Sequence, residues 1–374
     1  MLTRSDGRRK QRSKGGFATR GAGQAFLTEQ LARLGDGTYA TPAKTTVGAY
    51  LTDEWLPAVT PTLRPQSAAA YERAIRLYFV PGVGATRLQA LRGGHLNGLY
   101  ARLEQDGLSV AKRRQVHAVV HRGMRDAVRW GALTRNPAAA ADPPVPAPSR
   151  ALAWTAGELG RFLEHVTDDR LFALWRLGAT TGMRRGELLG LTWRTLDLEG
   201  ARLTVEQQLI PGTAGGVVFA PPKSARSRRS VALDPETLEA LRAHRDAQVL
   251  ERDLAGPAYV DQDLAFADAL GGPILPRGLT RVFHRHRKAA KIPTGTLHTL
   301  RHTAATLALT AGVPVHIVAA RLGDRPEQIL KTYAHLLPQS DELAAERVAA
   351  AIGKSVMRRP PGDRQRAHSA ASSD

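Results

Sequence analysis

The chain has 374 residues, contains no cysteine and carries a formal net charge of +19. The absence of cysteine excludes disulfide bonds, cysteine-ligated metal sites and thiol nucleophiles, and no apolar run approaches the roughly 18 residues of a membrane-spanning helix. Because the basic residues are spread from end to end, the charge indicates a polyanionic partner. With no disulfide and no membrane span expected, we interpret the chain as an intracellular protein.

Residues 1–44 begin with a strongly basic segment. Asp6 is outnumbered there by Arg4, Arg8, Arg9, Lys10, Arg12, Lys14 and Arg20. Such a run is typical either of a solvated tail or of a small module that lies on DNA phosphates. After it, the apolar residues Phe26, Leu27, Leu31 and Leu34 predict one helix over residues 21–35.

Residues 45–142 show helical periodicity throughout. Apolar residues recur at three- and four-residue spacing in four stretches, which predicts a compact domain of four amphipathic helices. The first helix should end before Pro57, the second at Pro81, the third at Gly107 and the fourth near Gly131. The apolar positions are Val47, Leu51 and Trp55, then Tyr71, Ile75, Tyr78 and Phe79, then Leu96, Leu99, Tyr100 and Leu103, and finally Val116, Val120, Met124 and Ala127.

The fourth of these helices carries a basic row opposite its apolar stripe. A charged row is usually a solvated face, but in a chain of this net charge we favour contact with the DNA backbone. The row consists of Arg114, His117, His121, Arg125 and Arg129.

Residues 138–149 are rich in alanine and proline, which is typical of a semi-extended linker. We therefore place the main domain boundary here, with a linker over residues 143–150. A second domain should follow over residues 151–355, and a basic, disordered tail over residues 356–374.

The second domain should begin with helices. Thr155 and Glu158 have the spacing of a capping box. Further on, Gly182 allows a tight turn into a helix that carries Arg184 near its start, where a guanidinium group can face a cleft. Glu187 could hold Arg184 in place, although such a pair is also an ordinary helix salt bridge.

Residues 202–233 form the clearest β region of the sequence. Alternation from Leu203 to Gln208 and the short runs 217–219 and 230–233 predict strands. We expect Lys223 at the tip of a hairpin, with Arg228 and Arg229 beside it as candidate DNA contacts. Asp234 and Pro235 should then start a helix as its N-cap and first residue.

A strongly basic helix with Arg285 and Arg287 as candidate DNA contacts precedes a helix that starts near Leu297. On the latter, His298 and Arg301 are three residues apart and share a face. Tyr333 follows in a polar, basic neighbourhood, and a short helix is expected from Asp341 to Ile352. Arginine binds phosphate oxygens in a fork, histidine transfers protons and tyrosine can act as a covalent nucleophile. This set suits attack by a phenol oxygen on a phosphodiester.

Five motifs stand in one order along the chain: Thr-Gly-Met-Arg-Arg-Gly-Glu, Pro-Lys-Ser, His-Thr-Leu-Arg-His-Thr, Arg-Leu-Gly and Thr-Tyr-Ala-His. Together they resemble the tyrosine recombinases, and in particular the phage-type integrases. The resemblance covers about residues 45–337. Residues up to Thr46 resemble, less specifically, the arm-site-binding module of such integrases.

The resemblance implies a fold that is mainly α with a small antiparallel β-sheet or hairpin. A helical, SAM-like core-binding domain and an α+β catalytic domain would form a C-shaped clamp around DNA. The partners would be double-stranded attachment sites, three further copies in a homotetramer on synapsed DNA, and, in some systems, an excision factor and a host DNA-bending protein. No metal and no high-energy cofactor are expected, and the location would be the bacterial cytoplasm, at the nucleoid.

The resemblance also assigns roles to residues. The catalytic set would be Arg184, Lys223, His298, Arg301 and Tyr333. Tyr333 would attack the phosphorus to give a 3′-phosphotyrosyl link and a free 5′-hydroxyl. The two arginines would stabilise the developing charge and lower the pKa of the phenol. His298 would be the base, with His302 as the alternative, and Lys223 would protonate the leaving oxygen.

One position departs from the family pattern. Where the family has histidine or tryptophan after Leu-Gly, nine residues before the tyrosine, this chain has Asp324. A carboxylate cannot donate a hydrogen bond to the scissile phosphate, and it would repel the phosphate unless it is turned away or paired with Arg321 or Arg325.

The expected function is a site-specific recombinase that integrates a mobile element. A resolvase, invertase or transposase with the same chemistry is a second reading, against which the basic N-terminal segment argues. A third is a DNA-binding relic whose cleavage Asp324 impairs.

Overall fold

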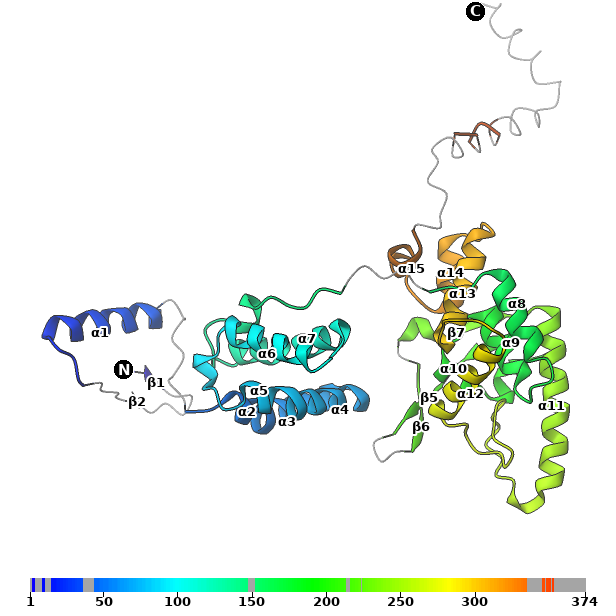
Figure 1. Cartoon of the computed structure of the whole chain (residues 1–374), viewed down its shortest axis with the longest axis horizontal. Coiled ribbons are helices and arrows are strands. Elements are labelled where there is room, and N and C mark those ends of the chain that lie inside the picture. Colours follow the sequence, from blue (N-terminus) through cyan, green and yellow to red (C-terminus); the bar gives the residue numbers. More distant parts are fainter. Residues whose placement is uncertain are drawn as a thin grey trace, which may run out of the picture. The chain divides into compact units, whose positions relative to one another are not determined.

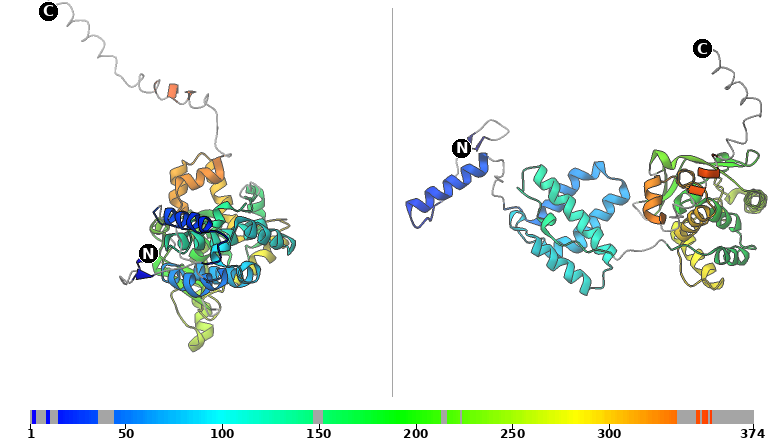
Figure 2. Two further views of the ribbon diagram at one scale, coloured as in Figure 1. Left: turned by 90° about the vertical axis from the view of Figure 1, so that its left-hand side faces the viewer. Right: turned by 90° about the horizontal axis from the view of Figure 1, so that it is seen from above.

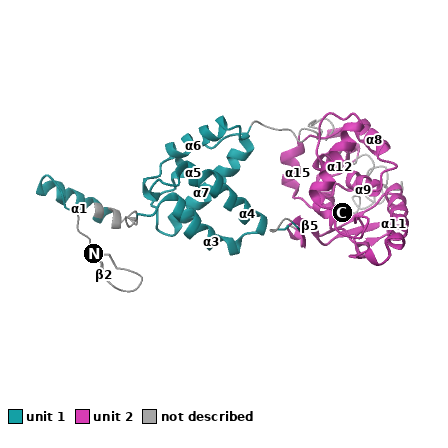
Figure 3. Ribbon diagram, turned by 60° about the horizontal axis from the view of Figure 1, so that its bottom comes forward, with its two compact units in different colours: residues 1–149, 212–216 teal, residues 150–211, 217–374 magenta. Residues whose placement is uncertain are grey.

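A computed structural model describes residues 2–3, 9–10, 15–35, 44–146, 152–212, 216–222, 224–334, 345–346, 348–350 and 352. The chain divides into two compact units (Figure 3). Unit 1 comprises residues 1–149 with 212–216, and unit 2 comprises residues 150–211 with 217–374. The fold is mainly helical with small antiparallel sheets, as predicted. Within the described part of the chain, every helix is too short or too polar for a membrane span.

Unit 1 opens with the paired strands β1 (Leu2–Thr3) and β2 (Arg9–Lys10) and with helix α1 (Arg20–Gly35), which matches the helix predicted there. The following helices lie in two layers, with α6 and α7 over α2 to α5 (Figure 1). Their bounds are α2 (Val47–Ala49), α3 (Leu56–Val59), α4 (Pro65–Ala74), α5 (Val80–Val83), α6 (Gly93–Gln105) and α7 (Val110–Arg129).

Two prolines do not end their helices, contrary to prediction. Helix α2 continues through a π-helical segment, Tyr50–Trp55, into α3, which contains Pro57. Helix α4 continues in the same way through Ile75–Phe79 into α5, which contains Pro81. A proline cannot donate the helical hydrogen bond and crowds the preceding turn. The wider π turn just upstream gives the ring room.

The core of unit 1 forms around Trp55. Its ring stacks on Tyr71 with 5.7 Å between centroids, and its indole N–H donates to the buried Asp126 of α7 over 2.9 Å. Gly123 of α7 lets the two layers approach, because a Cβ there would lie 2.9 Å from Leu51 Cδ2. The apolar stripes predicted from the sequence are therefore the surfaces that pack together.

Unit 2 contains the α-helices α8 to α15 and several short strands. Trp154, Phe162, Trp175 and Phe283 form the aromatic centre of its core and join α8, α9 and α12. The predicted capping box at Thr155 and Glu158 and the predicted N-cap at Asp234 are both present. The helices are α8 (Ala156–His165), α9 (Phe172–Thr181), α10 (Arg185–Leu189), α11 (Pro235–Ala255), α12 (Pro276–Ala289), α13 (Leu297–Thr310), α14 (Val315–Leu322) and α15 (Pro326–Tyr333).

The strands of unit 2 form two antiparallel sheets. Strands β3 (Leu196–Asp197), β4 (Arg202–Val205) and β7 (Arg229–Ala232) make one sheet, and β5 (Gln208–Pro211) pairs with β6 (Val217–Ala220) in the other. The alternating run predicted as one strand is thus divided between β4 and β5. Strands β6 and β7 belong to different sheets, so they do not form the hairpin predicted between them. Lys223 itself, predicted at its tip, lies outside the described residues.

Helices α13, α14 and α15 pack together through a small apolar cluster that includes Leu309, Val318, Leu322 and Tyr333. Both views of Figure 2 show α13 and α14, in orange, gathered at one side of their unit. Of the helix predicted over 341–352, only 345–346, 348–350 and 352 are described, and each of these is helical. The expected tail over 356–374 lies outside the described residues.

Candidate active site

Two arginines from distant parts of unit 2 converge on one carboxylate. Arg184 precedes α10 and Arg301 lies on α13, whereas Asp324 follows α14. Arg184 Nη2 donates to Asp324 Oδ1 over 2.6 Å, and Arg301 Nη2 donates to Asp324 Oδ2 over 2.5 Å. Each guanidinium group therefore binds a different oxygen of the same anion. Asp324 is paired with these two arginines rather than with Arg321 or Arg325, the partners considered from the sequence.

Gly182 makes this convergence possible. It ends α9 in the left-handed conformation with φ 65°, and a Cβ there would lie 2.4 Å from Leu322 Cδ2. Its carbonyl oxygen accepts a hydrogen bond of 2.8 Å from Arg301 Nη1. Only glycine satisfies both the backbone angle and the close approach. Gly182 therefore sets the direction in which the chain leaves α9 toward Arg184, and its carbonyl holds the guanidinium of Arg301.

A buried carboxylate, that of Glu187, binds the second terminal nitrogen of Arg184. Glu187 has a side chain only 2% exposed; it accepts from Arg184 Nη1 over 2.9 Å and from Arg229 Nη2 over 2.9 Å. Burial alone would raise the pKa of Glu187, but the guanidinium groups of Arg229 and Arg184 bring it below its usual value. The pair is thus part of a buried network, not the ordinary surface salt bridge that the spacing alone would also allow.

Tyr333 lies beside His302. The side chain of Tyr333 is buried, and its hydroxyl is 2.5 Å from His302 Nδ1. The rings of His298 and His302 meet edge to face with centroids 4.6 Å apart. His302, which the sequence ranked second as the base, is therefore the histidine in hydrogen-bond contact with the phenol.

The surroundings shift the pKa of each of these groups. Burial lowers the pKa of His298 to about 4, with help from His302, Arg301 and Arg184. The pKa of His302 is also lowered, first by burial and then by Arg301. Burial raises the pKa of Tyr333 to about 12; Arg301 opposes this rise and Asp324 adds to it. Arg301 therefore acts on the pKa of the phenol in the expected direction, but burial outweighs it and the net shift is upward.

The basic row on α7 is only partly available at the surface. Arg114 and Arg125 are exposed, whereas His117 and His121 are half-buried. His117 Nδ1 is 2.8 Å from the hydroxyl of Tyr100, which ties that histidine to α6. The three exposed arginines, Arg114, Arg125 and Arg129, remain the candidate DNA contacts of this row.

The other candidate DNA contacts divide in the same way. Arg228 and Arg285 are exposed, and Arg287 is half-buried and donates to the carbonyl of Ile292. Arg229 is different, because its side chain is only 6% exposed and also donates to the carbonyls of Arg321 and Ser227. Its prediction as a DNA contact is wrong; it holds Glu187 and the end of α14. Lys223 lies outside the described residues.

A sequence signal for the inward Arg229 exists. Residues two apart in a strand face the same side, and Val231 of β7 is buried. The alternation therefore places Arg229 on the buried face. No comparable signal indicates that Asp324 meets both arginines, since that contact depends on how three helices pack.

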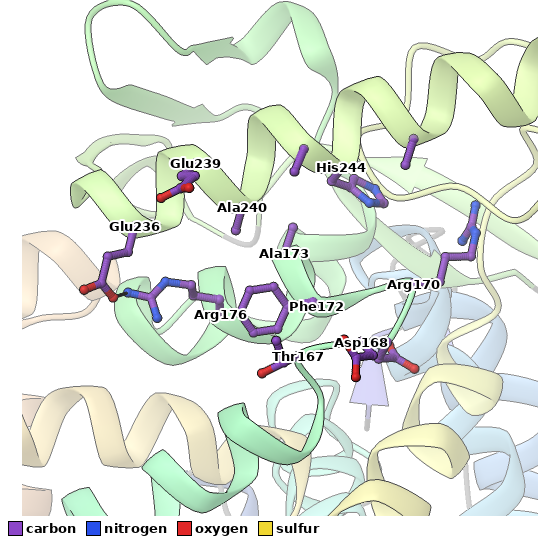
Figure 4. A pocket seen from close by; sticks show the side chains of 13 residues that line it. Thr167, Asp168, Arg170, Phe172, Ala173, Arg176, Glu236, Glu239, Ala240 and His244 are labelled. Atoms are coloured by element: carbon purple, nitrogen blue, oxygen red, sulfur yellow. Dashed lines mark hydrogen bonds and ion pairs between the residues drawn. The ribbon is translucent and has the colours of Figure 1, made fainter.

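A separate surface pocket of about 520 Å³ lies between α9 and α11 (Figure 4). Phe172 and Ala240 supply apolar lining, and Arg176, Glu239 and His244 supply polar groups. None of the predicted catalytic residues that the structure describes lines it, so it is distinct from the site of the two arginines.

Comparison with known proteins gives a consistent picture. Residues 156–340 match the model of the phage integrase family. An integrase of Saccharopolyspora erythraea is 24% identical over 357 residues, which cover 81% of this chain and 82% of that protein. A protein named tyrosine recombinase XerC-like, from Caldanaerobacter subterraneus subsp. tengcongensis, is 26% identical and covers 76% of this chain and 77% of its own length.

Solved structures share the fold. The Tn1549 transposon integrase in complex with a circular intermediate DNA superposes with a TM-score of 0.68 at 18% identity, covering 82% of this chain and 99% of that one. A lambda integrase dimer bound to a COC′ core site gives a TM-score of 0.56 at 19% identity, covering 75% of this chain and 96% of that one.

Proposed function

Because this chain belongs to the phage integrase family of tyrosine recombinases and is a site-specific recombinase that cleaves and rejoins DNA, we propose that Tyr333 is its nucleophile. The hydroxyl of Tyr333 attacks the scissile phosphorus, the 5′-oxygen leaves, and a 3′-phosphotyrosyl link forms. The observation that carries the proposal is that Tyr333 contacts His302 while Arg184 and Arg301 share Asp324. Arg301 lies near enough to both Tyr333 and His302 to shift the pKa of each. Because the link conserves the energy of the phosphodiester, rejoining needs no ATP.

Arg184 and Arg301 hold the phosphate in this mechanism. Both point an N–H group at one shared anion position, and arginine stays protonated throughout. The charge that develops on the non-bridging oxygens is then met by donors already in place. Removing one such donor commonly costs a factor of roughly 10²–10³ in rate.

His302 is the base in this proposal. Its pKa is lowered, so the ring is neutral near pH 7 and an unprotonated Nδ1 can accept the phenol proton. His298 packs against His302 and lies one helical turn before it on α13. Lys223 is assigned the protonation of the leaving 5′-oxygen on its match to the family motif.

We assign the DNA contacts to both units. Residues 1–44 would bind arm sites, residues 45–142 the core site, and residues 151–355 would carry out catalysis. The exposed basic residues of α7 and α12 supply phosphate contacts. The assembly that recombines is proposed to be a homotetramer on two attachment sites, with an excision factor and a DNA-bending protein setting direction.

A covalent trap tests the nucleophile. The full chain is incubated with a library of nicked duplexes of randomised sequence. In these, the short segment between the cleavage site and the nick, which carries the new 5′-hydroxyl, dissociates after cleavage, and adducts are retained through denaturing washes. Wild type should yield an adduct that maps to Tyr333, while Tyr333→Phe should bind DNA equally well and yield none. Tyr259→Phe, the same chemical change elsewhere in unit 2, should keep the adduct.

The trap also separates the competing readings. An adduct in Tyr333→Phe would refute the assignment of the nucleophile. Tight DNA binding by wild type without any adduct would favour the DNA-binding relic.

A further inference from the structure

The carboxylate of Asp324 has the position and contacts of a bound oxyanion. Its two oxygens receive separate N–H groups from Arg184 and Arg301 at 2.6 and 2.5 Å. Charge-assisted bonds of this length are the strong class, and the same donors suit the two non-bridging oxygens of a phosphodiester. No other ion pair is found for the guanidinium of Arg301 within the described residues.

We propose that, in the DNA-free protein, Asp324 occupies the position between Arg184 and Arg301 at which the scissile phosphate binds, here called the phosphate seat. DNA must then displace the carboxylate of Asp324 before cleavage. The inference rests on the proposed use of Arg184 and Arg301 for phosphate binding. It makes Asp324 a built-in competing anion for this recombinase.

The contact can open by rotation of one side chain. The backbone around Asp324 is held independently, since its N–H donates to the carbonyl of Ala319 over 3.0 Å and Gly323 donates to Ala320 over 3.1 Å. The side chain of Asp324 is 25% exposed and that of Arg184 is 31% exposed, so the seat is open to solvent on the side of Arg184. Exchange of ligands therefore leaves α14 in place.

Electrostatics favours an anion in the phosphate seat, both in the DNA-free protein and when DNA is bound. Arg301 is buried, and burial together with Arg184 lowers its pKa while Asp324 opposes the shift. Two guanidinium groups held together without an anion would be costly. A phosphodiester carries one negative charge, as the carboxylate does, so the exchange replaces one monoanion by another and leaves the arginines compensated throughout.

Binding of inorganic phosphate to the full-length, DNA-free protein tests the seat without any DNA chemistry. Isothermal titration calorimetry should show that Asp324→Asn binds phosphate about tenfold more tightly than wild type, or more, because no charged competitor has to leave. Glu327→Gln, an equal loss of charge at an exposed position of α15, should leave the affinity unchanged. Adding Arg184→Gln to Asp324→Asn should remove the gain.

The covalent trap supplies the second readout. At subsaturating DNA, Asp324→Asn and Asp324→His should form the Tyr333 adduct several-fold faster than wild type, whereas Glu327→Gln should match wild type. Urea unfolding of each variant verifies that it is folded. If Asp324→Asn is not folded, Asp324→His replaces it in the test.

The outcomes separate the two proposals. A gain in phosphate affinity with no adduct in any variant would leave the seat standing and defeat the proposed nucleophile. An adduct at Tyr333 with unchanged phosphate affinity in folded Asp324→Asn would overturn the seat. A slower adduct in both Asp324 variants would also overturn it, since Asp324 would then assist catalysis.

Discussion

Tyr333 and His302 illustrate how a residue's chemistry depends on its immediate surroundings. A phenol with a pKa of about 12 is a poor nucleophile at neutral pH, so its proton must be accepted as the bond to phosphorus forms. His302, at 2.5 Å, is placed to do so. Because its pKa lies below the ordinary value of 6.5, it is available as a base at neutral pH.

The rate of adduct formation should therefore rise with pH on a limb that lies below pH 6.5 and then level off. The sign follows because protonated His302 cannot accept, and the protonated form disappears as pH rises through its lowered pKa. His302→Gln should lose roughly 10²–10⁴ in rate and flatten this limb. His298→Gln, a matched change four residues earlier, should lose less. A larger loss in His298→Gln would return the role of base to His298.

At the scale of elements, Glu187 and Arg229 join α10, β7 and α14. Arg229 reaches the carbonyl of Arg321 at the end of α14 and the carboxylate of Glu187 in α10. Gly323 leaves room for this side chain, because a Cβ there would lie 2.9 Å from Arg229 Nη1. The ion pair thus sets the relative positions of the segments that carry Arg184 and Asp324.

Glu187→Ala should destabilise the protein by about 3–5 kcal/mol, because it leaves the buried guanidinium of Arg229 without its counter-ion. Urea unfolding at pH 7 measures this. Glu199→Ala removes an exposed partner of Arg242 and should have little effect. A small effect of Glu187→Ala would show that the network does not hold these elements together.

The same pair predicts acid sensitivity. The folded pKa of Glu187 lies below its unfolded value of 4.5, so the stabilisation is fully present above pH 4.5 and is lost as pH falls through the folded pKa. The difference in unfolding free energy between wild type and Glu187→Ala should therefore shrink below about pH 4.5. A difference that is constant across this range would contradict the shifted pKa.

At the scale of the whole molecule, the net charge of +19 is the dominant feature. Exposed arginines occur on α7 and α12, in different units, so both units can contribute phosphate contacts. Each contact releases counterions from DNA, which makes affinity fall steeply with salt.

A plot of log affinity against log salt concentration should therefore be steep for the full chain. Arg285→Ala should weaken binding to all sequences alike and reduce the slope by about 1. Arg242→Ala, which removes an equal charge on α11 beside Glu199, should leave the slope unchanged. Equal slopes for Arg285→Ala and wild type would remove α12 from the DNA interface.

The sequence by itself determined the helical character, the apolar stripes, the capping residues and the family. These depend on local periodicity and on motifs a few residues long, which do not require knowledge of the packing. The family motifs also indicated Arg184, Arg301 and Tyr333 as the residues to look for, since each motif carries one of them.

Tertiary structure alone decided what these residues do to one another. The π segments that carry Pro57 and Pro81 through their helices, the inward Arg229 and the contact of His302 with Tyr333 all depend on neighbours distant in sequence or on backbone adjustments that periodicity does not encode. The clearest case is Asp324, which the sequence marks only as a departure from the family pattern. Its carboxylate meets Arg184 and Arg301 because three helices converge there, 140 and 23 residues away along the chain.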